Sequence, residues 1–267
     1  MEESPNHHRP VHWRESVIEA LLLGLFMVSA CSITSLLQLP SSPLRRVIPD
    51  ALLRRAVIGV CMGLTATALI YSPWGQRSGA HMNPSVTLTF YRLGKIRWPD
   101  AALYIVGQFV GGVCGVLLSG VALRGILARP EIGFVATHPG AAGPWVALVA
   151  EFLISFLMMW MVLRVSNDAS LSRYTGWFAG LLVATYIAFE APYSGMSMNP
   201  ARSFASAVPS SLWMDLWIYL IAPPLGMLAG AEVYVRLRSD SPVMCCKLYH
   251  NPRKRCTFCG LNGDIHE

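Results

Sequence analysis

A short motif occurs twice in this chain, and it constrains the fold more than any other feature of the sequence. Residues 78–85 read Ser-Gly-Ala-His-Met-Asn-Pro-Ser and residues 194–201 read Ser-Gly-Met-Ser-Met-Asn-Pro-Ala, so five of eight positions are identical at an offset of 116 residues. In each copy an asparagine that can cap a helix precedes a proline at the first helical position, where the missing N–H costs nothing. Each motif therefore predicts the start of a short helix.

The composition indicates a membrane protein. The 267 residues are 54% hydrophobic and only 13% charged, with a mean hydropathy of +0.45, which is too apolar for an ordinary soluble domain. A spanning helix needs roughly 20 apolar residues. Six stretches meet this requirement, at about 16–39, 52–72, 99–123, 145–165, 174–191 and 213–235. We expect one all-α, multi-pass domain in a lipid bilayer, in the cell or inner membrane.

The net charge of +6 does not indicate a nucleic-acid partner, because the basic residues are scattered over short connectors and form no single basic face. Their distribution is better explained by membrane topology. Most of the 21 Lys and Arg residues fall on the segments that lie inside if both termini are cytoplasmic. We recognise no secretory signal peptide, so we predict cytoplasmic tails at residues 1–15 and 239–267.

The helices that the motifs begin, about 83–91 and 199–207, are too short to cross a bilayer. They occupy matching places in two hydrophobic halves, about 16–123 and 145–238. This pattern is typical of inverted repeats in which broken helices meet at the membrane midplane. Irregular backbone is tolerated at that depth only where protein buries it or a water-filled cavity solvates it. The repeat therefore predicts a pore.

Several residues around the motifs add to this pattern. The two boxes are Asn83-Pro84-Ser85 and Asn199-Pro200-Ala201; Arg202 follows the second box directly, and Glu19 and Glu151 lie in the first helix of each half. Together they resemble the aquaporin (major intrinsic protein) family over residues 16–238, although Ser85 replaces the usual alanine. The resemblance implies six membrane helices plus two half-helices, a homotetramer with one pore per subunit, and no required cofactor.

We expect the N-termini of both half-helices to point at one place, with partial positive charge and unpaired N–H groups. There Asn83 and Asn199 would donate hydrogen bonds to a passing water or hydroxyl, and the carbonyls of the extended segments Gly79–Met82 and Gly195–Met198 would accept. This arrangement would pass neutral solutes and reject ions and protons. The alternative is that each asparagine only caps its helix.

The resemblance also assigns a selectivity filter. Arg202 would be the filter arginine, and counting from the motifs places the other filter positions at Met62, Ile187 and Met196. Water-selective members of the family have an aromatic residue and a histidine at the first two of these positions, so this filter would be unusually apolar. We expect His81 to line the cytoplasmic half of the path, and not to bind a metal.

Glu19 and Glu151 lie in otherwise apolar spans. Because they recur at the start of both halves, we expect them to accept hydrogen bonds from the connectors that carry the boxes. The alternative interpretation is a pair of exposed charges at helix ends.

The C-terminal tail is rich in cysteine. Cys246, His250, Cys256 and Cys259 supply a C-x2-C pair and two further ligands, which is a pattern typical of tetrahedral zinc sites. A reducing cytosol disfavours disulfides. A disordered tail with incidental or lipidated cysteines is the alternative.

The sequence thus predicts a passive channel for water and small neutral solutes. One alternative is a facilitator for glycerol or hydrogen peroxide with little water flow, and another is a non-conducting junctional or scaffold protein. An intramembrane enzyme is disfavoured, because the spans contain no H-E-x-x-H motif and no Ser-His or paired-Asp constellation.

Overall fold

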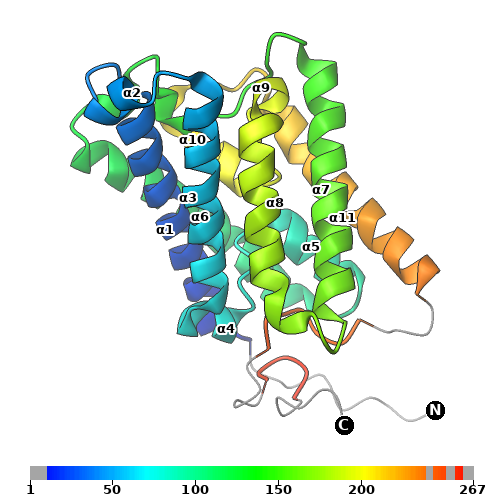
Figure 1. Ribbon diagram of the computed structural model, residues 1–267. Helices are drawn as coiled ribbons and strands as arrows, with labels where there is room; N and C mark the ends of the chain where they lie inside the picture. The colour runs from blue at the N-terminus through cyan, green and yellow to red at the C-terminus, as the bar shows by residue number, and fades with distance from the viewer. Residues whose placement is uncertain (1–10, 239–242, 251–255, 261–267) are drawn as a thin grey trace, which may run out of the picture.

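The computed structural model describes residues 11–238, 243–250 and 256–260, and every regular element in these residues is helical (Figure 1). Six long helices form a bundle: α1 (Trp13–Gln38), α3 (Ala51–Tyr71), α6 (Trp98–Ala122), α7 (Pro144–Ser166), α8 (Thr175–Phe189) and α11 (Leu216–Leu237). Two short helices lie within it, α5 (Pro84–Arg92) and α10 (Pro200–Ser210). The connectors hold α2 (Pro43–Val47), α4 (Pro73–Ser78), α9 (Ala191–Ser194) and the 3-10 turns η1 (Ile126–Ala128), η2 (Gly133–Val135) and η3 (Ser172–Tyr174).

The expected all-helical membrane fold is confirmed, with one difference in the fifth span. Among the described residues, five helices are long and apolar enough to cross a membrane by themselves, and α8 is not one of them. It has 15 residues and ends at Phe189, and the chain restarts as α9 with Pro192 in its first turn. A helix of that length spans about 22 Å, less than the roughly 30 Å hydrocarbon core. The predicted span 174–191 is therefore a helix followed by a separate turn.

The two halves repeat one order of elements, which is long, long, short, long. In the first half this order is α1, α3, α5, α6, and in the second it is α7, α8, α10, α11. Helix α1 packs on α6, α7 packs on α11, and α3 packs on α8 across the halves. Figure 1 shows α5 in the lower part of the bundle and α10 in the upper part. The half-helices thus lie at opposite ends, as an inverted repeat requires.

Glycines allow the three helix pairs to pack closely. A Cβ atom added to Gly111 of α6 would lie 2.0 Å from the carbonyl oxygen of Ala20 in α1. A Cβ on Gly63 of α3 would lie 2.3 Å from the carbonyl oxygen of Gly180 in α8. Since lipid tails are as apolar as the helix surfaces, such close backbone packing is a main source of helix association.

The described ends of the chain lie on one face of the bundle. The His12 ring lies 5.0 Å from the Phe258 ring, centroid to centroid, and the His12 backbone N–H donates to Asp100 Oδ1 at 2.7 Å. We call this the terminal face, defined by the start of α1 and by residues 243–250 and 256–260. The opposite side, with α2, η1 and η2, is the loop face (Figure 1).

Gly111→Ala should destabilise the protein because its methyl group would overlap the α1 backbone. Overpacking of this kind costs about 1–3 kcal/mol. Gly120→Ala in the same helix is the matched control, since its Cβ would lie 3.9 Å from the Phe134 ring, an ordinary contact. Thermal unfolding in detergent should show a lower midpoint for Gly111→Ala only. Equal midpoints would show that α1 and α6 do not approach so closely.

Candidate functional site

The two box asparagines cap the half-helices. Asn83 Oδ1 accepts from the Ser85 N–H at 2.8 Å. Asn199 Oδ1 accepts from the N–H groups of Ala201 at 3.1 Å and Arg202 at 3.2 Å. The helices begin at Pro84 and Pro200, as the motifs predict.

Each asparagine also reaches across to the other motif. Asn83 Nδ2 donates to the Met198 carbonyl at 2.6 Å, and Asn199 Nδ2 donates to the Met82 carbonyl at 2.7 Å. A carboxamide nitrogen carries two hydrogens, so one bond across the repeat leaves a second N–H on each side chain. Both asparagines line the same central cavity. Capping and cavity lining are therefore combined in the same two side chains.

The segments that approach the boxes have no regular secondary structure, and their backbone is not extended throughout. Positive φ angles recur at matching places, at positions 79, 80 and 82 and again at 195, 196 and 198. A left-handed conformation in a residue other than glycine costs about 1–3 kcal/mol. Such backbone persists only where its surroundings hold it in place.

Two buried carboxylates hold these segments. Glu19 Oε1 accepts from Ser78 Oγ at 2.6 Å and from the His81 N–H at 3.0 Å. Glu19 Oε2 accepts from the Met82 N–H at 2.5 Å and from Gln108 Nε2 at 3.0 Å. The carboxylate thus satisfies the backbone donors that a left-handed turn leaves without helix or sheet partners.

Glu151 repeats this arrangement in the second half. Its Oε1 accepts from Ser194 Oγ at 2.8 Å and from the Ser197 N–H at 2.7 Å, and its Oε2 accepts from the Met198 N–H at 2.7 Å. Both glutamates are fully buried, which is inconsistent with exposed charges at helix ends.

Two tyrosines complete the anchoring, a role that the sequence did not predict for them. Tyr104 Oη donates to the Ser78 carbonyl at 2.8 Å, and Tyr219 Oη donates to the Ser194 carbonyl at 2.5 Å. Their offset of 115 residues is one less than that of the motifs. A tyrosine that recurs at nearly the same offset as the motifs is the sequence signal that could have indicated this shared role.

A cavity of about 380 Å³ runs between the half-helices. Near the loop face its wall includes Gln38, Arg55 and Glu131, and near the terminal face it includes His81 and Leu248. The sequence did not single out Arg55, Glu131 or Leu248, which come from the start of α3, from the connector between α6 and α7, and from the tail. The cavity thus has polar groups at the loop face and a tail residue at the terminal face.

All four predicted filter residues line this cavity. Met62 and Met196 are buried at 2% and 7% exposure, and Ile187 is half-buried. Arg202 Nη1 is buried and has no hydrogen-bond partner within the described residues. A buried donor without a partner is costly, so this guanidinium is suited to donate to a solute in the cavity.

His81 uses both ring nitrogens in protein contacts. Its Nε2 lies 2.8 Å from the Cys246 carbonyl oxygen, and its Nδ1 lies 3.0 Å from Thr87 Oγ1. Because a carbonyl can only accept, Nε2 carries a hydrogen, and Nδ1 is occupied by its hydrogen bond with the threonine hydroxyl. The imidazole therefore has no lone pair left for a metal.

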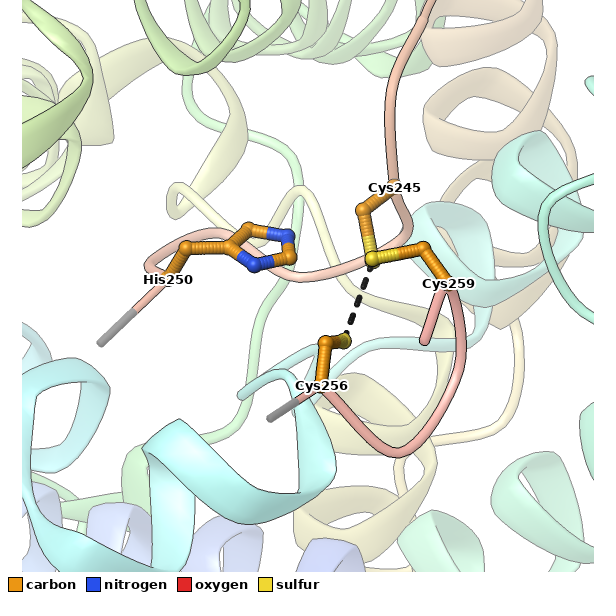
Figure 2. A group of neighbouring side chains, drawn as sticks. All are labelled: Cys245, His250, Cys256 and Cys259. Atoms are coloured by element: carbon orange, nitrogen blue, oxygen red, sulfur yellow. Dashed lines mark hydrogen bonds between the residues drawn. The ribbon is translucent and has the colours of Figure 1, made fainter. Parts of the chain in front are cut away.

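The tail brings together a different set of ligands from the one predicted. The side-chain ligand atoms of Cys245, His250, Cys256 and Cys259 all lie within 4.8 Å of one another (Figure 2). The assignment of Cys246 is wrong, because Cys245 and not Cys246 supplies the thiol of this group, while the Cys246 carbonyl accepts from His81 Nε2. Adjacent residues of an irregular segment point in different directions, so spacing alone could not separate Cys245 from Cys246.

The surroundings lower the pKa of two ligands in this cluster, Cys256 and His250, by different causes. A hydrogen bond from the Cys245 thiol lowers the pKa of the Cys256 thiol. Burial lowers the pKa of His250. A thiolate and a neutral imidazole are the forms in which these side chains bind metals.

The fold and the cavity together define a helical membrane protein built from an inverted repeat around a central cavity. Residues 6–234 match the model of the family described as Major intrinsic protein. The chain belongs to this family, whose members are integral membrane channels for water and small neutral solutes and not enzymes.

Similar proteins include the "Putative aquaporin NIP4-1" of Arabidopsis thaliana, 37% identical over 189 residues, which are 69% of this chain and 65% of that protein. The "Aquaporin NIP2-2" of Zea mays is 38% identical over 185 residues, 68% of this chain and 60% of that protein. The match thus spans slightly less than two thirds of these relatives. The solved aquaglyceroporin from Plasmodium falciparum has the same fold, with a TM-score of 0.71, 18% identity, and coverage of 83% of this chain and 94% of that one.

Glu151→Gln should destabilise the protein, because an amide nitrogen would replace one of the oxygens that accept from backbone N–H groups. A hydrogen bond to a charged group contributes about 1.5–3 kcal/mol, so the loss should be at least of this size. Glu232→Gln is the control, since its carboxylate is 46% exposed. Circular dichroism on heating in detergent should show a lower midpoint for Glu151→Gln alone. An unchanged midpoint would contradict an anchoring role.

Proposed function

We propose that the protein is a passive channel whose path is the central cavity, conducting water and small neutral solutes and excluding ions and protons. The observation that carries this proposal is the convergence of Asn83, Asn199 and Arg202 on one cavity of about 380 Å³. A solute oxygen in that cavity would accept hydrogen bonds from the second N–H of each asparagine. It would then meet the guanidinium of Arg202 nearer the loop face.

Exclusion of charge follows from the same groups. Both half-helices direct their N-termini, with a partial positive charge of roughly +0.5 each, toward the asparagines. Cations are repelled there, and Arg202 adds a full positive charge. Donors on both sides orient the oxygen of a water molecule toward themselves, which interrupts the chain of hydrogen bonds that proton transfer needs.

The filter favours solutes with some apolar surface. Met62, Ile187 and Met196 offer no hydrogen bond, so a water molecule beside them exchanges some of its partners for apolar wall. Methionine is flexible and adapts to larger solutes. We therefore propose passage of glycerol or a similar small solute together with water. The name of the solved aquaglyceroporin agrees with this class of solute.

We propose that the channel domain comprises residues 16–238 between two cytoplasmic tails, 1–15 and 239–267. By resemblance to the family, four copies would assemble with one path each. Permeation would need no cofactor, because the lining groups supply the hydrogen bonds. A zinc ion bound by the tail would have a structural role.

Ile187→His tests the filter. The imidazole should narrow and polarise the path, so glycerol flux should fall by more than water flux. Stopped-flow light scattering of proteoliposomes, with an osmotic step in sucrose for water and in glycerol for the solute, measures both. Ile187→Leu, which keeps the volume and polarity, should change neither flux.

Three outcomes would contradict parts of this proposal. Equal loss of both fluxes in Ile187→His would show that size selection lies elsewhere. Glycerol flux without water flux would indicate a solute facilitator. Fluxes of metal-stripped protein equal to those of protein-free vesicles would favour a junctional or scaffold role.

A further inference from the structure

The C-terminal tail is packed against the terminal-face end of the cavity. Leu248 is 6% exposed and forms part of the cavity wall, and its backbone N–H donates to the Gly79 carbonyl at 3.2 Å. Cys246 is fully buried, and its carbonyl binds His81 Nε2. Residues 246–248 therefore lie on the segment that leads into the first box.

Further contacts hold the tail on both sides. Lys247 Nζ donates to the Gln76 carbonyl at 2.9 Å, and the Met244 N–H donates to Asn167 Oδ1, just beyond α7, at 2.8 Å. The Tyr249 ring meets the Tyr71 ring edge-on, with centroids 4.9 Å apart. The tail thus bridges elements from both halves of the repeat.

The fit at Gly79 is close. A Cβ atom on Gly79 would lie 3.3 Å from Lys247 Cγ and 3.4 Å from the Cys246 carbonyl oxygen. Glycine suits this position for two reasons. It adopts the positive φ angle of 105° without steric cost, and its lack of a Cβ atom leaves room for the tail.

The residues that flank this docked segment belong to the cysteine and histidine cluster. Cys245 precedes residues 246–249 and His250 follows them, while Cys256 and Cys259 complete the group. The Sγ atoms of Cys245 and Cys256 lie 3.6 Å apart. Zinc–sulfur bonds of about 2.3 Å in tetrahedral geometry place two sulfurs about 3.8 Å apart, which this pair nearly matches. The four ligand atoms lie close enough together to bind one metal ion. They lie too close together to enclose a cluster of several iron atoms.

A second observation points independently to a ligand. His250 Nε2 is buried and has no hydrogen-bond partner within the described part of the chain. Figure 2 shows the ring turned toward the cysteine side chains. An imidazole nitrogen left without a partner among three thiols is suited to a metal bond.

We propose that Cys245, His250, Cys256 and Cys259 bind one Zn²⁺, and that the zinc-bound tail closes the terminal-face mouth of the cavity with Leu248. Three thiolates and one imidazole favour zinc, and four protein ligands leave no open coordination position, as in a structural site. Zinc ties both ends of residues 246–249 to the cluster, which stabilises the docked conformation over a released one. The closure rests on the proposed channel function, whereas the zinc site does not.

The metal site is tested on the full-length protein purified in detergent under reducing conditions. Elemental analysis should find about one zinc per chain. Cys245→Ser and Cys259→Ser should each lose most of it. Cys246→Ser is the matched control and should keep it, since that thiol is not one of the four grouped ligands. The site would be overturned if the wild-type protein still held no zinc after incubation with ZnCl₂. Loss of zinc in Cys246→Ser alone would overturn it as well.

The closure is tested by water permeability of proteoliposomes, with zinc-loaded protein and with protein stripped by EDTA. Stripping should raise the permeability several-fold, and adding Zn²⁺ back should lower it again. Leu248→Asp should be as permeable as stripped protein while still holding zinc, and Leu248→Met should resemble the wild type. Equal permeability of loaded, stripped and Leu248→Asp protein, all above protein-free vesicles, would overturn the closure and leave the channel intact. If no form exceeds protein-free vesicles, the proposed channel function fails, and the zinc content still decides the metal site.

Discussion

Backbone polar groups at the middle of a membrane must find partners within the protein, and in this chain two buried carboxylates provide them. An unsatisfied backbone group in hydrocarbon costs several kcal/mol. Glu19 accepts from the N–H groups of His81 and Met82, and Glu151 accepts from those of Ser197 and Met198. Without these bonds the left-handed turns before each box would lose what offsets their strain. The half-helices, the crossed asparagine bonds and the cavity all depend on those turns.

The repeat is symmetric in how the motifs are anchored and asymmetric in what each motif binds. Position 81 is histidine, and its ring bonds to the tail at Cys246. The equivalent position, Ser197, contacts Ser203 Oγ, which also accepts from Thr137 of the loop-face connector. One motif therefore contacts the C-terminal tail and the other a connector between the halves. This difference gives the two ends of the path different possibilities for regulation.

The sequence was most informative where the chemistry is local and repeated. An asparagine followed by proline and an apolar run predicts a helix start from neighbouring residues alone, and the structure has helices starting at Pro84 and Pro200. The glutamates could be anticipated because a charge in each of two matching apolar spans needs a partner. The left-handed conformations before each box could not be anticipated. Residues such as Met82 and Met198 adopt them only because carboxylates from distant parts of the sequence bind their backbone N–H groups. Likewise, Cys245 and Cys246 are equivalent in spacing, and only packing against His81 separates them. The docking of Leu248 depends on contacts between residues more than 160 positions apart in the sequence.

Passage of neutral molecules with rejection of charge is the property that the two half-helix N-termini and Arg202 are arranged to give. The most direct test compares water and proton permeability in the same proteoliposomes, using light scattering for water and an enclosed pH-sensitive dye for protons. We expect metal-stripped protein to raise water permeability above that of protein-free vesicles while proton permeability stays at the protein-free level. A proton flux that rises together with the water flux would contradict charge exclusion at the paired asparagines.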